Sequence, residues 1–210
     1  MTVHLVEGGL FVLTAIVLLG TPGPAIAALV AIGRQIGFKR SLRFFIGLQC
    51  GLAFAAAISA AGLFSALQAL PGATLLMTIT ASTYLAYLAY KIATAPVGIE
   101  LGTGTERAAF TPTPAGGFLL GASNPKAYVA FISMMASYQI VPSHGYIDAS
   151  AKWFICILVM IFVDTLWLWF GDIIRRSNLS AKAERILNVC MAAIILATIA
   201  FALFDFSGTP

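Results

Sequence analysis

The stretch VLLGTPGPAIAALVAI, from Val17 to Ile32, places two prolines and two glycines inside an otherwise apolar run. Proline removes a backbone donor and clashes with the preceding turn, which costs a helix interior roughly 3 kcal/mol. Pro22 and Pro24 are only two residues apart, and apolar residues continue on both sides of them. The stretch therefore predicts a long apolar helix that is interrupted in its middle.

The composition indicates the solvent in which this chain folds. Of its 210 residues, 60% are hydrophobic and 10% are charged, and the mean hydropathy is +0.96. Soluble domains average about 25% charged residues, so this chain has too few charges to cover a water-facing surface. The pI of about 9.1 does not indicate nucleic-acid binding, because the basic residues flank apolar segments. The composition predicts an integral membrane protein.

Six apolar segments are long enough to cross a bilayer, which requires about 20 mostly apolar residues. They cover residues 5–32, 43–66, 73–95, 116–140, 152–174 and 185–204. The first segment does not resemble a signal peptide, because Glu7 and no basic residue precedes its apolar core. The sequence therefore predicts an all-α membrane protein with six transmembrane helices.

The lysines and arginines predict the orientation of these helices. Ten of the twelve follow the first, third and fifth segments: Arg34, Lys39, Arg40, Arg43, Lys91, Arg107, Arg175, Arg176, Lys182 and Arg185. Loops rich in lysine and arginine stay in the cytoplasm. We expect a multi-pass protein of the inner (plasma) membrane with both termini outside.

A loop rich in proline and glycine separates the first three segments from the last three. Three is an odd number, so the two halves must face opposite ways across the membrane, as in many transporters. The sequence thus predicts two inverted three-helix repeats, residues 1–95 and 116–210, joined by a cytoplasmic linker over 96–115. Because similarity between the halves is weak, six unrelated helices remain an alternative.

The fourth segment carries its own interruption, in GASNPKAYVAF at residues 121–131, which contains Pro125. Both breaks lie about 10 residues from the cytoplasmic end, hence about 15 Å deep in a core of about 30 Å. Backbone opened at that depth survives only beside protein or a water-filled cavity, and its ends offer amides to anions and carbonyls to cations. Two matched breaks favour a central binding site over a simple packing kink.

Three stretches resemble, in order, the LysE/RhtB family of amino-acid exporters: GTPGPAIAALVAIGRQIGFKRSLRFFIGLQCG, STYLAYLAYKI and FLLGASNPKAYVAF. The resemblance covers nearly the whole chain, and it implies a transporter that carries a small amino acid or related metabolite outward. Leu52 replaces a polar residue often found after the glycine of the second helix, and this departure bears on the substrate rather than on transport.

The candidate substrate-binding residues surround the two breaks. They are Thr21, Pro22, Gly23 and Pro24 at the first break, Asn124, Pro125 and Lys126 at the second, and Tyr84 on the third helix. Lys126 could meet a substrate carboxylate, pair with Asp164, or extend toward the cytoplasm. Thr21 and Asn124 could cap the opened helix ends or contact the ligand. Tyr84 could line a cavity from one helix face.

Asp164 lies midway along the fifth segment, and its side chain is too short to reach water. Buried acids often mark proton relays, so Asp164 is the candidate proton-coupling residue, although a protonated aspartate that hydrogen-bonds a neighbouring helix is an equal alternative. The sequence has no nucleotide-binding motif, which favours the proton gradient as the driving force. Two GxxxG spacings, Gly47–Gly51 and Gly117–Gly121, predict close helix packing.

Other classes of function lack their residues. His4 and His144 both lie outside the apolar segments and no HExxH motif occurs, so we expect no enzyme, no cofactor and no metal site. A metal or inorganic-ion exporter would need several carboxylate, histidine or cysteine ligands near the midplane. That exporter and a passive channel remain the alternatives. The expected partners are a small-molecule substrate and the lipid bilayer, without nucleic acid, and a homo-oligomer is compatible with the sequence.

Overall fold

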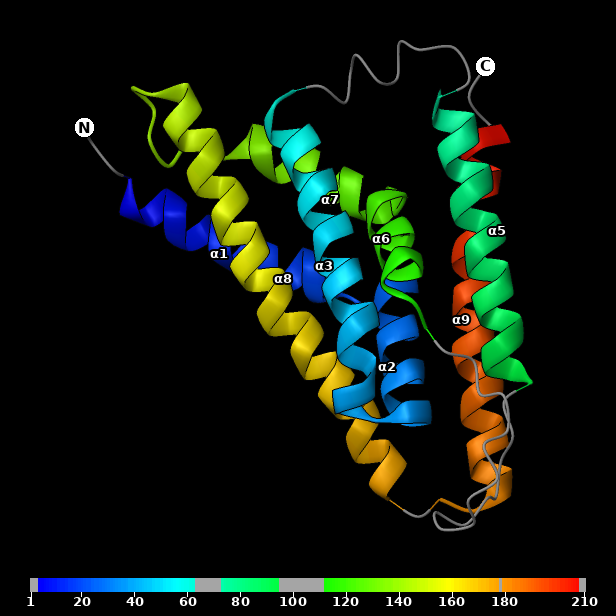
Figure 1. Ribbon diagram of the computed structural model, residues 1–210. Coiled ribbons are helices and arrows are strands. Elements are labelled where there is room, and N and C mark those ends of the chain that lie inside the picture. Colours follow the sequence, from blue (N-terminus) through cyan, green and yellow to red (C-terminus); the bar gives the residue numbers. More distant parts are fainter. Residues whose placement is uncertain (1–3, 63–72, 95–111, 178, 208–210) are drawn as a thin grey trace.

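The computed structural model describes residues 4–62, 73–94, 112–177 and 179–207, and within them the chain forms helices and loops. Figure 1 shows the helices: α1 (Leu5–Gly20), α2 (Pro24–Ile36), α3 (Phe38–Ala60), α5 (Ala73–Ala93), α6 (Pro114–Ala122), α7 (Pro125–Ser137), α8 (Gly145–Arg176) and α9 (Ala181–Ser207). The predicted linker lies mostly outside the described residues, which resume at residue 112.

Both predicted interruptions are present. α1 ends at Gly20 and α2 begins at Pro24, with the two helix axes bent by 63°. α6 ends at Ala122 and α7 begins at Pro125. Pro24 and Pro125 each occupy the first helical position, where the fixed φ of proline suits the helix and its missing amide leaves no bond unmade. The prolines therefore begin new helices, and do not merely kink old ones.

Length and composition alone identify fewer membrane spans than the sequence predicted. Within the described residues, α3 and α8 are each long and apolar enough to cross a membrane, and the bent α1–α2 pair counts as a third span if taken as one. α5, the α6–α7 pair and α9 cover the remaining predicted segments. Six spans therefore stay a prediction. Helix ends also differ from the predicted ends, most clearly in α8, because hydropathy marks the apolar part of a helix and not its polar first and last turns.

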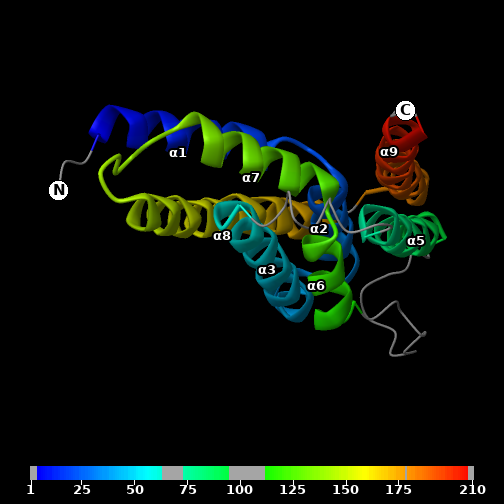
Figure 2. The ribbon, with the colours of Figure 1, turned by 90° about the horizontal axis from the view of Figure 1, so that it is seen from above.

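The helices pack in three main pairs: α3 with α6, α2 with α8, and α5 with α9. α3 and α8 also contact each other, α1 contacts α8, and α1 and α7 lie next to each other in Figure 2. The α5–α9 pair stands to one side of the other helices in both views. Each half of the chain thus packs its second helix against the broken helix of the other half.

The two GxxxG spacings face each other across the α3–α6 contact. A Cβ at Gly47 or Gly51 would overlap the backbone of α6, and a Cβ at Gly117 or Gly121 would overlap the backbone of α3. Without side chains at these four positions, the two backbones come into direct contact. The predicted close packing is confirmed, and the structure adds that the two motifs are partners.

α8 carries a row of large apolar side chains on the outside of the molecule. Phe154, Leu158, Phe162, Leu166 and Trp169 are all exposed. A contiguous apolar surface of this kind needs an apolar neighbour, which for a membrane protein is lipid. The exposed side of α8 is therefore suited to contact the hydrocarbon of a bilayer.

Most of the basic residues in the described part of the chain gather at one end of the helices. Figure 1 places the α2–α3 junction, the end of α5 and the α8–α9 junction toward the bottom. Contacts join them there: Arg34 donates to Asn188 Oδ1, and Arg185 donates to the carbonyl of Ala93 at 2.7 Å. This clustering agrees with the predicted positive end, and which side of the membrane it faces stays a prediction.

Candidate functional site

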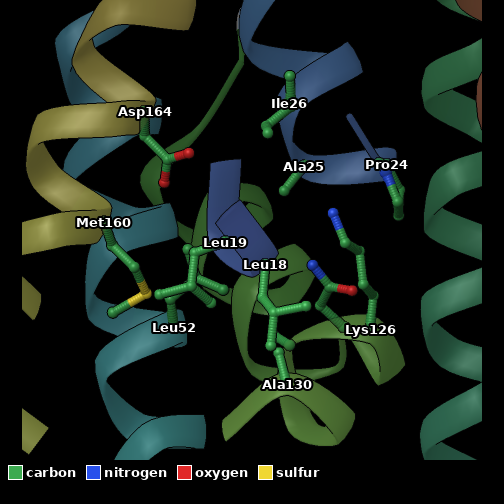
Figure 3. A pocket seen from close by; sticks show the side chains of 13 residues that line it. Leu18, Leu19, Pro24, Ala25, Ile26, Leu52, Lys126, Ala130, Met160 and Asp164 are labelled. Atoms are coloured by element: carbon green, nitrogen blue, oxygen red, sulfur yellow. The ribbon is translucent and has the colours of Figure 1, made fainter. Parts of the chain in front are cut away.

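The two helix breaks meet at one small cavity (Figure 3). Its walls come from the end of α1, the start of α2, the start of α7, and the middle parts of α3 and α8. The predicted residues among its lining are Gly23, Pro24, Asn124, Lys126 and Asp164, and most of the other lining side chains are apolar. The cavity has a volume of about 40 Å³, which is room for a few water molecules.

The first break opens backbone groups of both signs, and the start of α2 borders the cavity. At the end of α1, the indole of Trp167 donates to the carbonyl of Gly20 at 3.3 Å. At the start of α2, Ala25 and Ile26 line the cavity. First-turn amides have no acceptor within their own helix, and the helix dipole adds positive potential there. The start of α2 therefore forms a positive part of the cavity wall.

Lys126, from the second break, reaches across to the first. Its ammonium donates to the carbonyl of Thr21. Its stem lies over Gly23, where an added Cβ would be 3.0 Å from Lys126 Cδ and 3.3 Å from Nζ. The glycine thus leaves the space that the lysine occupies. Lys126 is held at the break and does not extend toward the positive end of the molecule.

Asp164 enters the cavity from α8, on the side away from Lys126 (Figure 3). Its side chain is only 4% exposed. Asp164 Oδ2 accepts a hydrogen bond from Gln49 Nε2 of α3 at 2.7 Å. Gln49 Oε1 is buried and has no partner among the described residues. Sequence reasoning missed Gln49, although a lone amide in an apolar helix was a signal.

Asn124 lines the cavity without acting as a helix cap. It precedes α7, but its side chain makes no capping hydrogen bond. Its Oδ1 atom is buried and lacks a partner among the described residues, and the whole residue is 5% exposed. Of the two roles that the sequence left open for Asn124, capping is not observed, and a free acceptor remains beside the cavity.

Four other predicted residues do not line the cavity. Thr21 is exposed and contributes only its carbonyl, which accepts from Lys126, while its hydroxyl donates to the carbonyl of Val17. Pro22 and Pro125 are also exposed. Tyr84 lies on α5 with its ring against Gly116 of α6. The sequence left open whether this face of the helix lines a cavity, and in the structure the Tyr84 ring meets another helix.

The family model of the LysE type translocators matches the chain over residues 16–205. The chain belongs to the LysE type translocator family. No match was found among curated proteins or among solved structures. The matched range confirms the resemblance seen in the sequence, and it includes both breaks and every residue that lines the cavity.

LysE type translocators are membrane transporters of amino acids and related compounds. The cavity of this translocator has the features that a transporter site needs: buried polar groups of both charges within a largely apolar wall. Among the described residues, no group of three or more histidine, cysteine, aspartate and glutamate side chains is arranged to hold a metal ion.

A second polar cluster in the translocator joins the end of α7 to the start of α8. Lys152 Nζ contacts Asp148 Oδ2 at 2.7 Å and donates to the carbonyls of Met135 and Tyr138. Asp148 Oδ1 accepts the amide of Val141 at 2.8 Å. Both charged side chains are nearly buried. The cluster anchors the α7–α8 connection, and the i,i+4 spacing of its two charged residues was its signal in the sequence.

Proposed function

We propose that this translocator exports a small amino acid, or a related metabolite that carries both an ammonium and a carboxylate, across the plasma membrane. The substrate binds in the cavity where the two helix breaks meet. One observation carries the proposal: Lys126 and the start of α2 line one side of the cavity, and Asp164 lines the other. A zwitterion presents the opposite charge to each side.

The substrate carboxylate binds at the start of α2. The amides of Ala25 and Ile26 and the ammonium of Lys126 supply donors there, and the helix dipole favours an anion. In the structure Lys126 donates to the Thr21 carbonyl. A bound carboxylate gives this ammonium a charged acceptor, and such hydrogen bonds are roughly twice as strong as neutral ones.

The substrate ammonium binds at Asp164. Gln49 holds one oxygen of this carboxylate at 2.7 Å and leaves its own Oε1 without a partner among the described residues. Asn124 Oδ1 is a further free acceptor beside the cavity. An ammonium carries three donors, so its binding would satisfy buried acceptors that otherwise cost free energy.

Coupling to protons follows if one carboxylate serves two ligands. Asp164 can hold a proton or pair with an ammonium, but a protonated carboxyl no longer attracts the cation. At the cytoplasmic side the substrate displaces the proton, and at the outer side a proton displaces the substrate. Each cycle then exchanges one substrate for one proton, and an inward proton gradient drives export.

The cavity must open for this cycle to operate. A volume of about 40 Å³ holds a few water molecules and no amino acid. The two breaks supply the movable parts, because residues 21–23 and 123–124 join short helices without belonging to them. We propose that α1 and α7 change their angles to α2 and α6 as access alternates between the two sides.

We propose that six spans form two inverted repeats, residues 1–95 and 116–210, around the linker 96–115. The packing supports this arrangement: α3 from the first half packs against the α6–α7 pair, and α8 from the second half packs against the α1–α2 pair. Single cysteines at Thr103 and Thr209 in a cysteine-free background test it. An impermeant thiol reagent added to intact cells should label only the second position. Labelling at Thr103 would overturn the inverted arrangement.

Counterflow in proteoliposomes tests the transport function. Vesicles loaded with one unlabelled amino acid should take up the same labelled amino acid, and the twenty standard amino acids are tried in turn. We then compare competition by the active amino acid with that by its N-acetyl and its amide derivatives. Each derivative loses one charge and should compete at least tenfold more weakly. If none of the twenty moved, the amino-acid assignment would be wrong.

A further inference from the structure

A second hollow lies at the positive end of the molecule, between the α2–α3 turn and the last turns of α8. It has a volume of about 380 Å³. Four basic side chains, Lys39, Arg40, Arg175 and Arg176, line it together with the single acid Asp172. We call this hollow the basic cleft. One carboxylate against four cations leaves a surplus of three positive charges.

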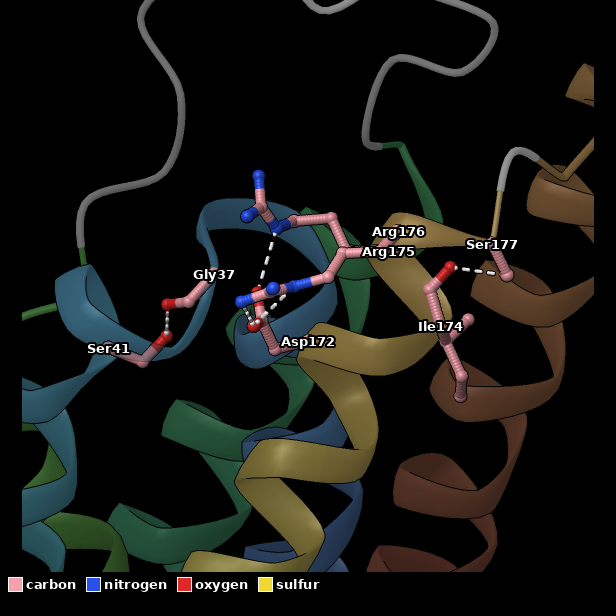
Figure 4. A network of polar contacts seen from close by, with 7 residues as sticks. All are labelled: Gly37, Ser41, Asp172, Ile174, Arg175, Arg176 and Ser177. Atoms are coloured by element: carbon pink, nitrogen blue, oxygen red, sulfur yellow. Dashed lines mark hydrogen bonds and ion pairs between the residues drawn. The ribbon is translucent and has the colours of Figure 1, made fainter.

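Asp172 does not neutralise the whole cleft, because its hydrogen bonds go to only two of the four basic side chains, Arg175 and Arg176 (Figure 4). Arg175 Nε and Arg176 Nε each donate to it at 3.0 Å, and Arg176 Nη2 donates at 2.6 Å. The amide of Phe38 also donates to this carboxylate, which is 1% exposed. Asp172 therefore fixes the floor of the cleft and ties α8 to the start of α3.

The α2–α3 turn is shaped to receive one of these arginines. Gly37 has a φ of +81°, which a side chain would strain. An added Cβ at this position would also lie 3.0 Å from three atoms of the Arg175 guanidinium group. Lys39 and Arg40, just after the turn, are exposed. They make no hydrogen bond or ion pair with another described residue, so their charges are available to a ligand.

Exposed apolar side chains continue from the basic residues along both helices. On α3, Leu42 and Ile46 follow Lys39 by three and seven residues, which places them on one face. On α8, exposed Ile173 and Trp169 precede Arg176 by three and seven residues. Each stripe thus runs from a cation at the helix end toward the apolar middle of the helix. A phospholipid is built in the same order, with a charged headgroup at one end and hydrocarbon chains at the other.

We propose that the basic cleft binds the headgroup of an anionic phospholipid. The phosphate lies among Lys39, Arg40 and Arg176, and the acyl chains run along the exposed apolar stripes. Guanidinium and ammonium groups at the end of a membrane-spanning helix are a favourable site for such headgroups. The stripes favour a lipid over a free phosphate ion, because acyl chains bind apolar surface and a phosphate ion does not. This site lies apart from the transport cavity and does not depend on the proposed substrate.

Binding of dioleoyl phosphatidylglycerol to the purified full-length protein in detergent tests the proposal, with native mass spectrometry as the readout. Dioleoyl phosphatidylcholine is the comparison lipid. The double variant Lys39→Gln plus Arg40→Gln should bind phosphatidylglycerol about 30-fold more weakly, because each basic residue near an anionic headgroup contributes a factor of about five. Phosphatidylcholine should bind more weakly than phosphatidylglycerol to the wild-type protein.

The double variant Arg43→Gln plus Lys182→Gln is the matched control. It removes the same two residue types from the same end of the molecule, and neither residue lines the cleft. We expect its affinity to stay within about threefold of wild type, with thermal melting of both variants used to check folding. Equal losses in the two variants, or equal binding of the two lipids, would overturn the proposal. Displacement of the lipid by millimolar inorganic phosphate would reassign the cleft to free anions.

Discussion

Replacing Asp164 by asparagine tests the coupling mechanism most directly. The two side chains have nearly the same shape, but asparagine cannot take up or release a proton. Asparagine can still accept the hydrogen bond that Gln49 donates at 2.7 Å. Its new amide donor can meet Gln49 Oε1, which has no partner among the described residues. We therefore expect the variant to fold, with a loss of less than about 1 kcal/mol in the free energy of unfolding.

The expected losses in transport can be worked out separately for binding and for coupling. An ammonium bound to a buried carboxylate gains about 1.5–3 kcal/mol from the charge, so the KM for exchange should rise roughly 10- to 150-fold. One pH unit is worth about 1.36 kcal/mol for each proton. With one proton exchanged for each substrate, wild-type protein should support an approximately tenfold concentration ratio. Asp164→Asn should support a ratio of about one.

Proteoliposomes give both quantities in one preparation. Labelled substrate is followed first as exchange at equal pH, and then as net accumulation with a one-unit pH difference and the membrane potential clamped. The control is Glu7→Gln, which removes another carboxylate, near the start of α1 and outside the cavity lining. This control should behave as wild type in both assays.

Tenfold accumulation by Asp164→Asn would refute the reasoning and leave Asp164 as a structural hydrogen-bonding residue. Complete loss of exchange at saturating substrate would also contradict it, because the proposal requires an uncoupled carrier that still turns over. Asp164→Glu restores a titratable group and should recover part of the accumulation. Recovery of exchange without accumulation in the glutamate variant would assign substrate binding, but not coupling, to this position.

Three further predictions follow from the packing at the breaks and at the α3–α6 contact. Lys126→Met should raise the KM for exchange at least tenfold with little change in expression, whereas Lys126→Arg should keep the KM closer to that of wild type. Equal KM values for wild type and Lys126→Met in flux assays would show that Lys126 does not contact the substrate. Pro22→Ala combined with Pro24→Ala should let the first helix run straight, giving normal membrane levels in immunoblots but no transport; full transport would reduce the break to a packing feature. Gly51→Ala should destabilise the protein by about 1–3 kcal/mol in thermal melting, because the added Cβ overlaps the α6 backbone. Gly9→Ala should not, because a Cβ added there has no atom within 4 Å. Equal melting temperatures for the two variants would contradict the packing of the two glycine motifs.

The sequence by itself determined the membrane class of this protein, the positions of both breaks and the small-residue surfaces. These properties are local. Too few charges to face water is a matter of composition, and a proline at the start of a helix acts through its own ring and missing amide, as at Pro24 and Pro125. Glycines four residues apart create a flat helix surface whatever helix lies opposite.

Only the tertiary structure decided which of these surfaces and side chains meet. Lys126 contacts a carbonyl 105 residues earlier in the chain, and Gln49 reaches Asp164 across 115 residues. Helical periodicity suggested that Tyr84 could line a cavity, but in the structure its ring packs against Gly116 of α6. The physical reason is that periodicity specifies the direction of a side chain relative to its own helix axis. The neighbour it meets depends on how the helices pack, including the 63° bend between α1 and α2, and no local pattern encodes that.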